Sequence, residues 1–344
     1  MKLLLPSRLI LCLSVITFFS ACHHAPKTEG NEAIKTDTTK SVAKDSFAKL
    51  NDEIAANPRN AELLYERAKI FEDRNVMNSA FSDASAAVAI DSTETKYLML
   101  LADIAFKTYQ IKKASETFEK VTKLEPKNPE AYLKLAELYF YIKGYQKSVY
   151  YANEALKLDK HLVRAYYIKG FVYKEKGDTA LAVSSFNTVL DIQPEDYDAC
   201  IQLGNIYSVR KSVLALQYYN NALKYRPGST EAFYNRGLFY QMAGQFDKAM
   251  SDYETILKLD PKYADAYYNI GFINSVVKKD YKTAIVNFTD AIRCDEQYAE
   301  AFYNRGMCYE LSGDKSSAIN DYKAALRIIP TYKEAKERLR GMSN

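Results

Sequence analysis

The chain has 344 residues, of which 48% are hydrophobic and 26% are charged, with 29 tyrosines and no tryptophan. This is the composition of a folded protein, and the length exceeds that of one compact core, so several domains or an elongated array are expected. The formal net charge is +4, and charges of both signs are interleaved along the chain. This pattern excludes the concentrated basic face that is typical of nucleic-acid-binding proteins.

Residues 1–21 have the three parts of an export signal. Positively charged residues come first, residues 9–19 are mostly apolar, and two small residues precede Cys22. The apolar run of 11 residues is shorter than the roughly 20 that a helix needs to span a bilayer. We therefore predict a signal peptide that takes no part in the fold.

The end of this segment, Phe19-Ser20-Ala21-Cys22, resembles the lipobox of bacterial lipoproteins, with phenylalanine where leucine is usual. The resemblance implies that the Cys22 thiolate takes a diacylglycerol, that cleavage falls before Cys22, and that acyl chains such as palmitate anchor the protein. An ordinary secretory signal that contains a cysteine is the alternative. No acidic residue directly follows Cys22. By resemblance to lipoprotein sorting, this implies the outer membrane and a periplasmic orientation.

Residues 22–45 comprise the lipidated cysteine and a polar segment with few bulky apolar side chains. Such a segment cannot bury enough surface to fold. We predict a flexible tether with an average reach of roughly 25–30 Å.

Small residues recur along the rest of the chain at intervals of 33 to 35 residues. One series is Ala68, Ala102, Ala136, Gly170, Gly204, Gly237, Gly271 and Gly306, and the other is Ala80, Ala114, Ser148, Ala182, Ala215, Ala249, Ala284 and Ala318. Apolar residues at i, i+3, i+4 and i+7 beside them predict helices, two in each repeat. Five glycines in register within helices indicate close helix–helix approach, because glycine costs about 1 kcal/mol relative to alanine there. Further glycines, Gly177, Gly244 and Gly313, mark the break between the two helices, with Gly144 one place later.

This period and pattern identify the chain as a member of the tetratricopeptide repeat family. The resemblance covers residues 46–342 and implies an all-α, right-handed superhelical solenoid of helix-turn-helix repeats. We predict a half-repeat helix at 46–60, eight repeats within 61–332, and a C-terminal capping helix at 333–344. The eight repeats are 61–94, 95–128, 129–162, 163–196, 197–229, 230–263, 264–298 and 299–332. The fifth is one residue short and the seventh one residue long, and we expect both changes in the turn between the helices.

In this family the first helix of each repeat lines the concave groove. One equivalent place there holds Tyr65, Tyr167, Tyr234, Tyr268 and Tyr303, and the next holds Asn235, Asn269 and Asn304 in the last three units. An asparagine amide can donate to and accept from a peptide backbone, and tyrosine is a common interface anchor. The asparagine row resembles the ladder of some peptide-binding tetratricopeptide proteins, which implies peptide binding at these eight residues. The alternative is that they satisfy helix ends or pack against neighbours.

The first repeats have a different lining, with Glu66, Lys134 and Gln202 where the asparagines later fall. The array can therefore hold two partners on two surfaces, or form a homodimer through one of them. The sequence leaves both open.

We predict a scaffold or adaptor that binds envelope proteins or extended peptides, with a peptidoglycan- or glycan-binding protein as the alternative. Catalytic motifs such as HExxH, GxSxG, a glycine-rich phosphate loop and CxxC do not occur, so we expect no enzyme, no cofactor and no metal site. Three cysteines follow Cys22, namely Cys200, Cys294 and Cys308, and we expect all three to be buried thiols.

Overall fold

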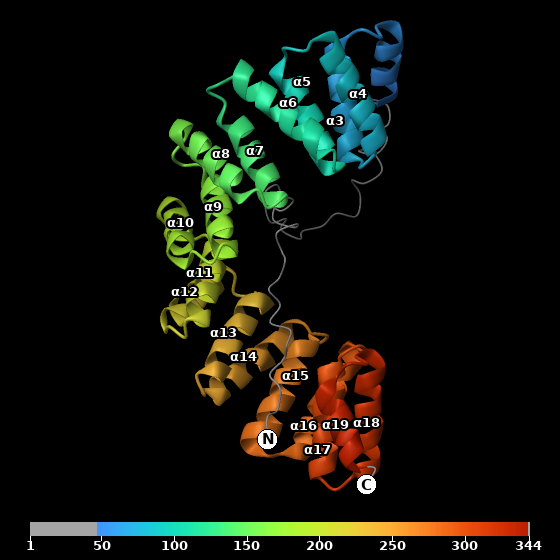
Figure 1. Cartoon of the computed structure of the whole chain (residues 1–344), viewed down its shortest axis with the longest axis vertical. Helices are drawn as coiled ribbons and strands as arrows, with labels where there is room; N and C mark the ends of the chain where they lie inside the picture. Colours follow the sequence, from blue (N-terminus) through green and yellow to red (C-terminus); the bar gives the residue numbers. More distant parts are fainter. Residues whose placement is uncertain (1–46, 343–344) are drawn as a thin grey trace, which may run out of the picture. The chain divides into compact units, whose positions relative to one another are not determined.

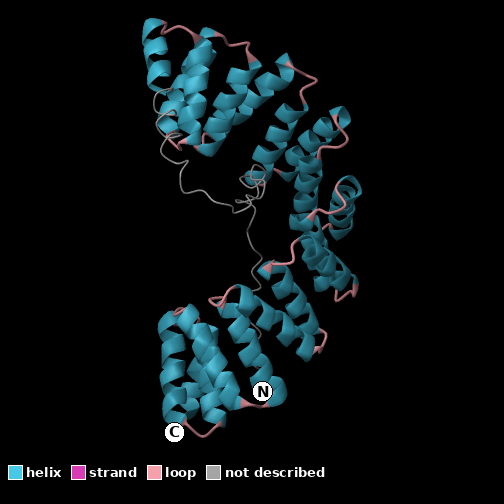
Figure 2. Ribbon diagram, turned by 180° about the vertical axis from the view of Figure 1, so that it is seen from behind, coloured by secondary structure: helices cyan, strands magenta, loops and turns pink. Residues whose placement is uncertain are grey.

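A computed structural model describes residues 47–342 of the chain. Every regular element in this range is a helix, so the predicted all-α class is confirmed (Figure 2). None of these helices combines the length and the apolar character that crossing a membrane requires. The predicted signal peptide, Cys22 and the tether of residues 22–45 lie outside the described residues.

The described helices belong to two compact units, one ending at Pro194 and the other beginning at Glu195. The first unit contains a helix over residues 47–56 and then α3 (Ala61–Asp73), α4 (Met77–Ile90), α5 (Thr95–Lys107), α6 (Ile111–Leu124), α7 (Pro129–Tyr141), α8 (Tyr145–Leu158), α9 (Val163–Glu175) and α10 (Thr179–Ile192). The second unit contains α11 (Tyr197–Val209), α12 (Leu214–Tyr225), α13 (Thr230–Met242), α14 (Phe246–Leu259), α15 (Ala264–Ile273), the π-helix η2 (Asn274–Lys278), α16 (Tyr281–Cys294), α17 (Ala299–Leu311), α18 (Lys315–Ile328) and α19 (Lys333–Met342).

Consecutive helices pair into hairpins, from α3 with α4 to α17 with α18. Within each unit the second helix of a hairpin packs against the first helix of the next one (Figure 1). First helices therefore form one layer of each unit and second helices form the other. This is the solenoid of stacked hairpins that the repeat period predicts.

Close contact between the two helices of a hairpin explains the glycine series. A Cβ atom on Gly204 would lie 2.5 Å from the ring of Tyr219, and one on Gly237 would lie 2.8 Å from the ring of Tyr253. The same relationship joins Gly170 to Phe186, Gly271 to Phe288 and Gly306 to Tyr322. In each case an aromatic ring of the second helix fills the space that a side chain on the first helix would need.

Each hairpin turns through one residue with a left-handed backbone, with φ between 53° and 87°. These residues are Asn75, Tyr109, Lys143, Gly177, Lys211, Gly244, Lys279 and Gly313. Gly144, which the sequence places one residue after the equivalent glycines, does not belong to this set, because it has φ of −76° and caps the start of α8. The left-handed residue of that turn is Lys143, and the Gly144 N–H donates to the Tyr139 carbonyl at 2.7 Å to close the turn.

The two irregular repeats change their helices and not only their turns. In the fifth repeat α12 has 12 residues, where the second helix of every other hairpin has 14. In the seventh repeat α15 continues directly into the π-helix η2, which takes up the extra residue. The expectation that the turn alone absorbs both changes is therefore wrong.

Three arginines on first helices, Arg67, Arg236 and Arg305, bind across the layers. Each donates from Nε and Nη2 to both carboxylate oxygens of an aspartate 16 residues later, at 2.6 to 2.9 Å; the aspartates are Asp83, Asp252 and Asp321. The third nitrogen, Nη1, donates to a side chain 16 residues earlier, which is Asn51, Asn220 or Thr289. Asn51, on the helix over residues 47–56, therefore accepts a hydrogen bond from Arg67 in the same way that Asn220, on the preceding second helix α12, accepts one from Arg236.

Candidate functional site

Most of the tyrosines that the sequence assigns to a peptide-binding groove are buried. The exposed fraction is 7% for Tyr167, 9% for Tyr234, 0% for Tyr268 and 2% for Tyr303. The prediction that these four side chains line an open surface is wrong. Their rings belong to the core between the helix layers.

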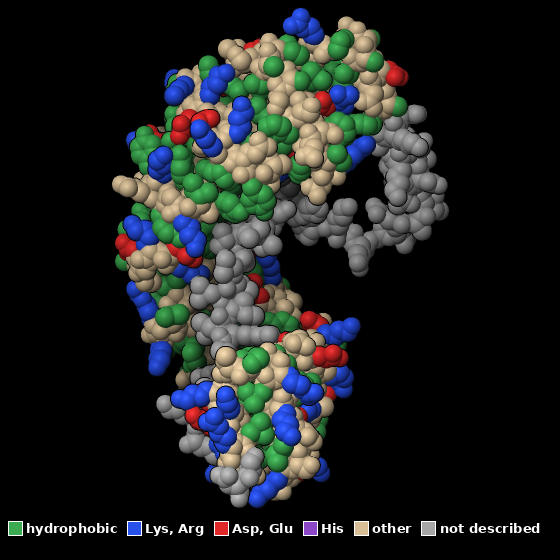
Figure 3. All heavy atoms as spheres, turned by 45° about the vertical axis from the view of Figure 1, so that its right-hand side comes forward, with side chains coloured by type: hydrophobic (Ala, Val, Ile, Leu, Met, Phe, Trp, Pro, Cys, Tyr) green, Lys and Arg blue, Asp and Glu red, His purple; other side chains and the backbone are tan. Residues whose placement is uncertain are grey.

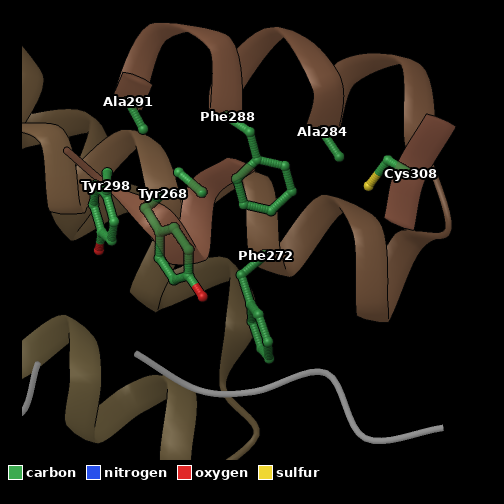
Figure 4. Close-up of a cluster of buried hydrophobic side chains, with 8 residues drawn as sticks. Tyr268, Phe272, Ala284, Phe288, Ala291, Tyr298 and Cys308 are labelled. Atoms are coloured by element: carbon green, nitrogen blue, oxygen red, sulfur yellow. The ribbon is translucent and has the colours of Figure 1, made fainter. Parts of the chain in front are cut away.

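The three predicted tyrosines that are buried in the second unit each pack between two other rings. Tyr268 lies 5.6 Å from Phe288 of α16 and 4.9 Å from Tyr298, which directly precedes α17 (Figure 4). Tyr234 lies in the same way between Tyr253 and Tyr263, and Tyr303 between Tyr322 and Tyr332. One of the two rings comes from the segment that leads to the next hairpin. These tyrosines therefore pack at the contact between successive hairpins.

Two of the three predicted ladder asparagines are also buried. Asn269 and Asn304 are 0% exposed, and their placement at an open groove surface is wrong. The Asn304 amide donates to the Tyr268 hydroxyl at 2.6 Å, and the Asn269 amide donates to the Asp265 carbonyl at 2.8 Å. Burial raises the pKa of Tyr268 well above its usual value, so the hydroxyl that accepts from Asn304 stays protonated at neutral pH.

Asn235 and Tyr65 differ from the other six residues because both are partly exposed. The Tyr65 ring lies 5.3 Å from that of Tyr97, and the ammonium groups of Lys69 and Lys96 lie 5.1 and 5.5 Å from its centre. Tyr65 and Asn235 stand in different units. Within the second unit, Asn235 is the predicted asparagine that can still reach a ligand.

The first-helix layer of the first unit is joined by ion pairs between neighbouring hairpins. Lys96 Nζ lies 2.6 Å from a Glu62 oxygen, and Lys134 Nζ lies 2.8 Å from an Asp103 oxygen. Arg164 binds both Glu130, at 3.2 Å, and the buried Glu137. These side chains neutralise one another along the layer.

Two members of this ion-pair set have shifted pKa values. Desolvation acts against the charge of Lys134, but the carboxylates of Asp103 and Glu137 outweigh it and raise the Lys134 pKa. Burial raises the pKa of Glu137, against the opposing charge of Arg164. These ion pairs link adjacent first helices, so their role is structural.

The second unit exposes a row of apolar side chains at the ends of its first helices. The row consists of Val209, Met242, Val276 and Leu311, with exposed fractions of 79%, 50%, 37% and 42%. Sequence reasoning missed this apolar row. The signal was present, because the four residues are spaced by 33, 34 and 35 residues, like the glycines. In the first unit the same place holds Asp73, Lys107, Tyr141 and Glu175, of which three are charged.

Titratable side chains of residues 47–342 form no group of three or more histidine, cysteine or acidic residues that could hold a metal ion. His161 is exposed. Cys200 and Cys308 are buried, as expected, but Cys294 is partly exposed, so that prediction is wrong for one thiol of the three. On the face drawn in Figure 3, basic and acidic side chains are interspersed.

Two family models, both described as tetratricopeptide repeat, match this chain. One matches residues 230–263 and 299–332, and the other matches residues 95–128 and 163–196.

Curated relatives match over part of their length. The chain is 26% identical over 224 residues to BBSome complex member BBS4 of Bos taurus, which covers 65% of this chain and 43% of that protein. It is 30% identical over 127 residues to tetratricopeptide repeat protein 6 of Homo sapiens, which covers 35% of this chain and 23% of that protein. The chain thus spans less than half the length of these two relatives.

Solved structures share the fold. The C-terminal part of a tetratricopeptide repeat-containing protein from Cytophaga hutchinsonii is 23% identical, with a TM-score of 0.59 over 71% of this chain and 98% of that one. A chain of the APC/C hetero-tetramer Cut9–Hcn1 is 15% identical, with a TM-score of 0.50 over 89% of this chain and 60% of that one. Repeat spacing, hairpin geometry, family models and fold agree, and the chain belongs to the tetratricopeptide repeat family.

Proposed function

We propose that this protein is an interaction scaffold that binds partner proteins on the first-helix layer of its second unit. The observation that carries the proposal is the apolar row of Val209, Met242, Val276 and Leu311, which repeats one exposed apolar side chain on four successive first helices. Apolar side chains that are exposed together mark protein interaction sites more often than single ones do. The name of one relative, BBSome complex member BBS4, describes a protein that works within a complex.

The partly exposed Asn235 and Tyr65 remain candidates for contact with a partner. The six buried residues of the predicted peptide-binding set pack in the core and do not contribute to this surface. Burial of four of the five predicted tyrosines also removes most of the aromatic surface on which the peptidoglycan- or glycan-binding alternative depends.

We further propose that the scaffold is anchored by acyl chains on Cys22 in the bacterial outer membrane and faces the periplasm. The lipobox-like Phe19-Ser20-Ala21-Cys22 supports this part of the proposal. Metabolic labelling with an alkyne palmitate analogue tests it directly. The wild-type chain should become labelled and pellet with membranes, whereas Cys22→Ser should do neither.

Site-specific photocrosslinking in intact cells, read by mass spectrometry, tests partner binding. The double variant Met242→Gln with Leu311→Gln should lose its crosslinked proteins. A matched control is Leu259→Gln with Leu158→Gln, because these leucines end second helices and are 48% and 42% exposed, close to the 50% and 42% of Met242 and Leu311. Equal crosslinking of both double variants would refute the surface. Crosslinks to the chain itself would assign it to a homodimer, and retention on cell-wall sacculi without protein crosslinks would favour the glycan alternative.

A further inference from the structure

Two neighbouring hairpin turns of the first unit carry exposed aromatic, aliphatic and basic side chains. Tyr109 in the α5–α6 turn is 74% exposed, and Tyr141 and Ile142 at the end of α7 are 40% and 43% exposed. The Tyr141 ring lies 6.3 Å from that of Tyr109 and 5.5 Å from that of Phe106, so the two turns adjoin. The turn patch consists of the exposed residues Tyr109, Lys113, Tyr141, Ile142 and Lys143.

Tyr109 occupies a backbone position that does not suit a bulky residue. Its φ is 61°, in the left-handed region, where the equivalent residues of the other turns are glycine, asparagine or lysine. A bulky side chain in this conformation is an outlier that the surrounding structure must hold in place. Packing in the core does not explain the tyrosine, because its side chain is largely exposed. An exposed aromatic residue at a strained turn points to contact with a surface outside the chain.

The charge of this edge differs from that of the opposite edge of the same hairpins. Residues 107–113 and 141–147 contain five lysines and no acidic residue. At the other ends of these helices, residues 124–130 and 158–164 contain three acidic and three basic residues. In the two neighbouring turns acidic residues offset the basic ones; they are Asp73 beside Arg74, and Glu175 and Asp178 beside Lys174 and Lys176. The excess of lysine is therefore specific to the two turns of the patch.

The described part of the chain begins at the same edge. The Phe47 ring lies 5.6 Å from that of Phe71 near the end of α3, and the Arg74 guanidinium in the α3–α4 turn lies 4.4 Å from its centre. The Lys107 ammonium donates to Glu72 at 2.8 Å, which links that turn to the α5–α6 turn. The predicted tether therefore joins the first unit at this edge. The opposite edge lies about 20 Å farther away, which is the length of a 14-residue helix such as α6 or α8.

We propose that the turn patch rests on the surface of an anionic lipid bilayer, with its tyrosines and isoleucine among the headgroups and its lysines against their phosphates. Tyrosine suits this interface because its ring is apolar and its hydroxyl is polar. Each basic residue near an anionic surface favours contact by about fivefold. A basic patch is also the second signal that makes attachment by acyl chains stable. The inference rests on the proposed acylation of Cys22, which holds the chain at the membrane, and adds the face that meets the lipid.

A tryptophan reporter tests the contact, because the chain has no tryptophan of its own. Tyr109→Trp places an indole in the turn patch, and Leu124→Trp places one at the far end of α6, where Leu124 is 42% exposed. The acylated full chain is reconstituted in vesicles of phosphatidylethanolamine and phosphatidylglycerol whose acyl chains carry bromine, which quenches indole fluorescence on contact. We expect quenching and a blue shift of the emission for Tyr109→Trp and neither for Leu124→Trp.

Charge variants test the lysines of the patch. Lys113→Gln with Lys143→Gln, made in the Tyr109→Trp chain, should shift the equilibrium away from surface contact by about 25-fold and so reduce the quenching. Lys127→Gln with Lys160→Gln removes two exposed lysines from the opposite edge and should leave the quenching unchanged. Higher salt should also reduce the quenching, because the attraction is electrostatic. Circular dichroism checks that each variant keeps its helical content.

Flotation of the same vesicles distinguishes this inference from the proposed anchoring. A chain that floats with the vesicles but shows equal quenching at both positions, or none at either, would overturn the inference and leave the anchor standing. Full quenching in Lys113→Gln with Lys143→Gln would equally overturn it. A chain that does not float contradicts the acylation, and the inference that rests on it is then overturned as well. Partner binding at Met242 and Leu311 is decided separately by the in-cell crosslinking.

Discussion

Arg236 holds Asp252 through two parallel hydrogen bonds, from Nε to Oδ2 at 2.9 Å and from Nη2 to Oδ1 at 2.6 Å. The Asp252 side chain is 6% exposed and that of Arg236 is 20% exposed. A bidentate pair of this kind is stronger than a single contact because both partners are charged and the geometry is fixed. It joins α13 to α14, and the contact of Arg236 with Asn220 on α12 joins that hairpin to the preceding one.

Replacing Asp252 by alanine should destabilise this hairpin by about 3 kcal/mol, because it leaves a largely buried guanidinium without its carboxylate. Hydrogen exchange measured by mass spectrometry should show lost protection in α13 and α14. Asp290→Ala is the control, since Asp290 pairs with an arginine that is 69% exposed. Its loss should cost at most about 1 kcal/mol. Equal loss of protection in the two variants would contradict the assigned role.

Replacing Gly237 by alanine should lower stability although alanine favours helices. The new Cβ would lie 2.8 Å from Cε1 of Tyr253, whose side chain is fully buried. Overpacking of a core costs about 1–3 kcal/mol, which exceeds the gain of up to about 1 kcal/mol in helix propensity. Gly341→Ala in α19 has no atom within 4 Å of the new Cβ and should be neutral or stabilising. Thermal unfolding followed by circular dichroism distinguishes the two, and a stabilised Gly237→Ala would refute the packing argument.

The carboxyl of Asp198 should make stability fall as pH rises from about 4 to 6. Burial raises the pKa of Asp198 to about 6, with Arg226 at 3.7 Å acting in the opposite direction. In the unfolded chain an aspartate has a pKa of about 3.9, so over this range the unfolded state has lost the proton that the folded state retains. Deprotonation therefore favours unfolding.

Asp198→Asn should remove this pH dependence. The melting temperature of the variant minus that of wild type should increase from pH 4 to pH 7. The increase should be a few degrees at most, because the Asp198 side chain is 37% exposed. Glu254→Gln, on an exposed carboxylate, serves as the control. A difference in melting temperature that does not vary with pH would exclude the effect.

The three thiols of the helical region should differ in reactivity. Burial raises the pKa of Cys200 to about 11 and that of Cys308 to about 12, whereas Cys294 is partly exposed. Because the thiolate is the reactive form, iodoacetamide at pH 7.5 should modify Cys294 first. Peptide mapping should find Cys200 and Cys308 modified only after denaturation. Labelling of Cys308 as fast as that of Cys294 in the native protein would contradict the buried placement.

The fold was predictable from the sequence because its main constraint is local. Gly204 and Tyr219 are only 15 residues apart, and the contact between them recurs in register in later repeats. A short period of small residues therefore reveals both the hairpin and its register. The helix caps follow the same logic, as when the Asn60 side chain accepts from the backbone N–H groups of Glu62 and Leu63.

The orientation of the tyrosines could not be predicted in the same way. Tyr268 is buried by Tyr298, a residue of the segment that leads to the next hairpin, and the period within one repeat does not show that contact. Tyrosine also suits both a core and an interface, so its type does not decide between them. By contrast, Met242 and Leu311 have no polar group, and their exposure at equivalent helix ends is the more informative signal.

The arginine contacts at 16 residues on either side have an evolutionary consequence. Arg236 and Arg305 are 69 residues apart and use equivalent partners, Asn220 and Thr289 before them and Asp252 and Asp321 after them. Excision of residues 236–304 would bring Arg305 to the same distance from Asn220 that Arg236 now has. Duplication or loss of hairpins in pairs would thus preserve these arginine hydrogen bonds. Such proteins can therefore become longer or shorter while the contacts between the remaining hairpins stay the same.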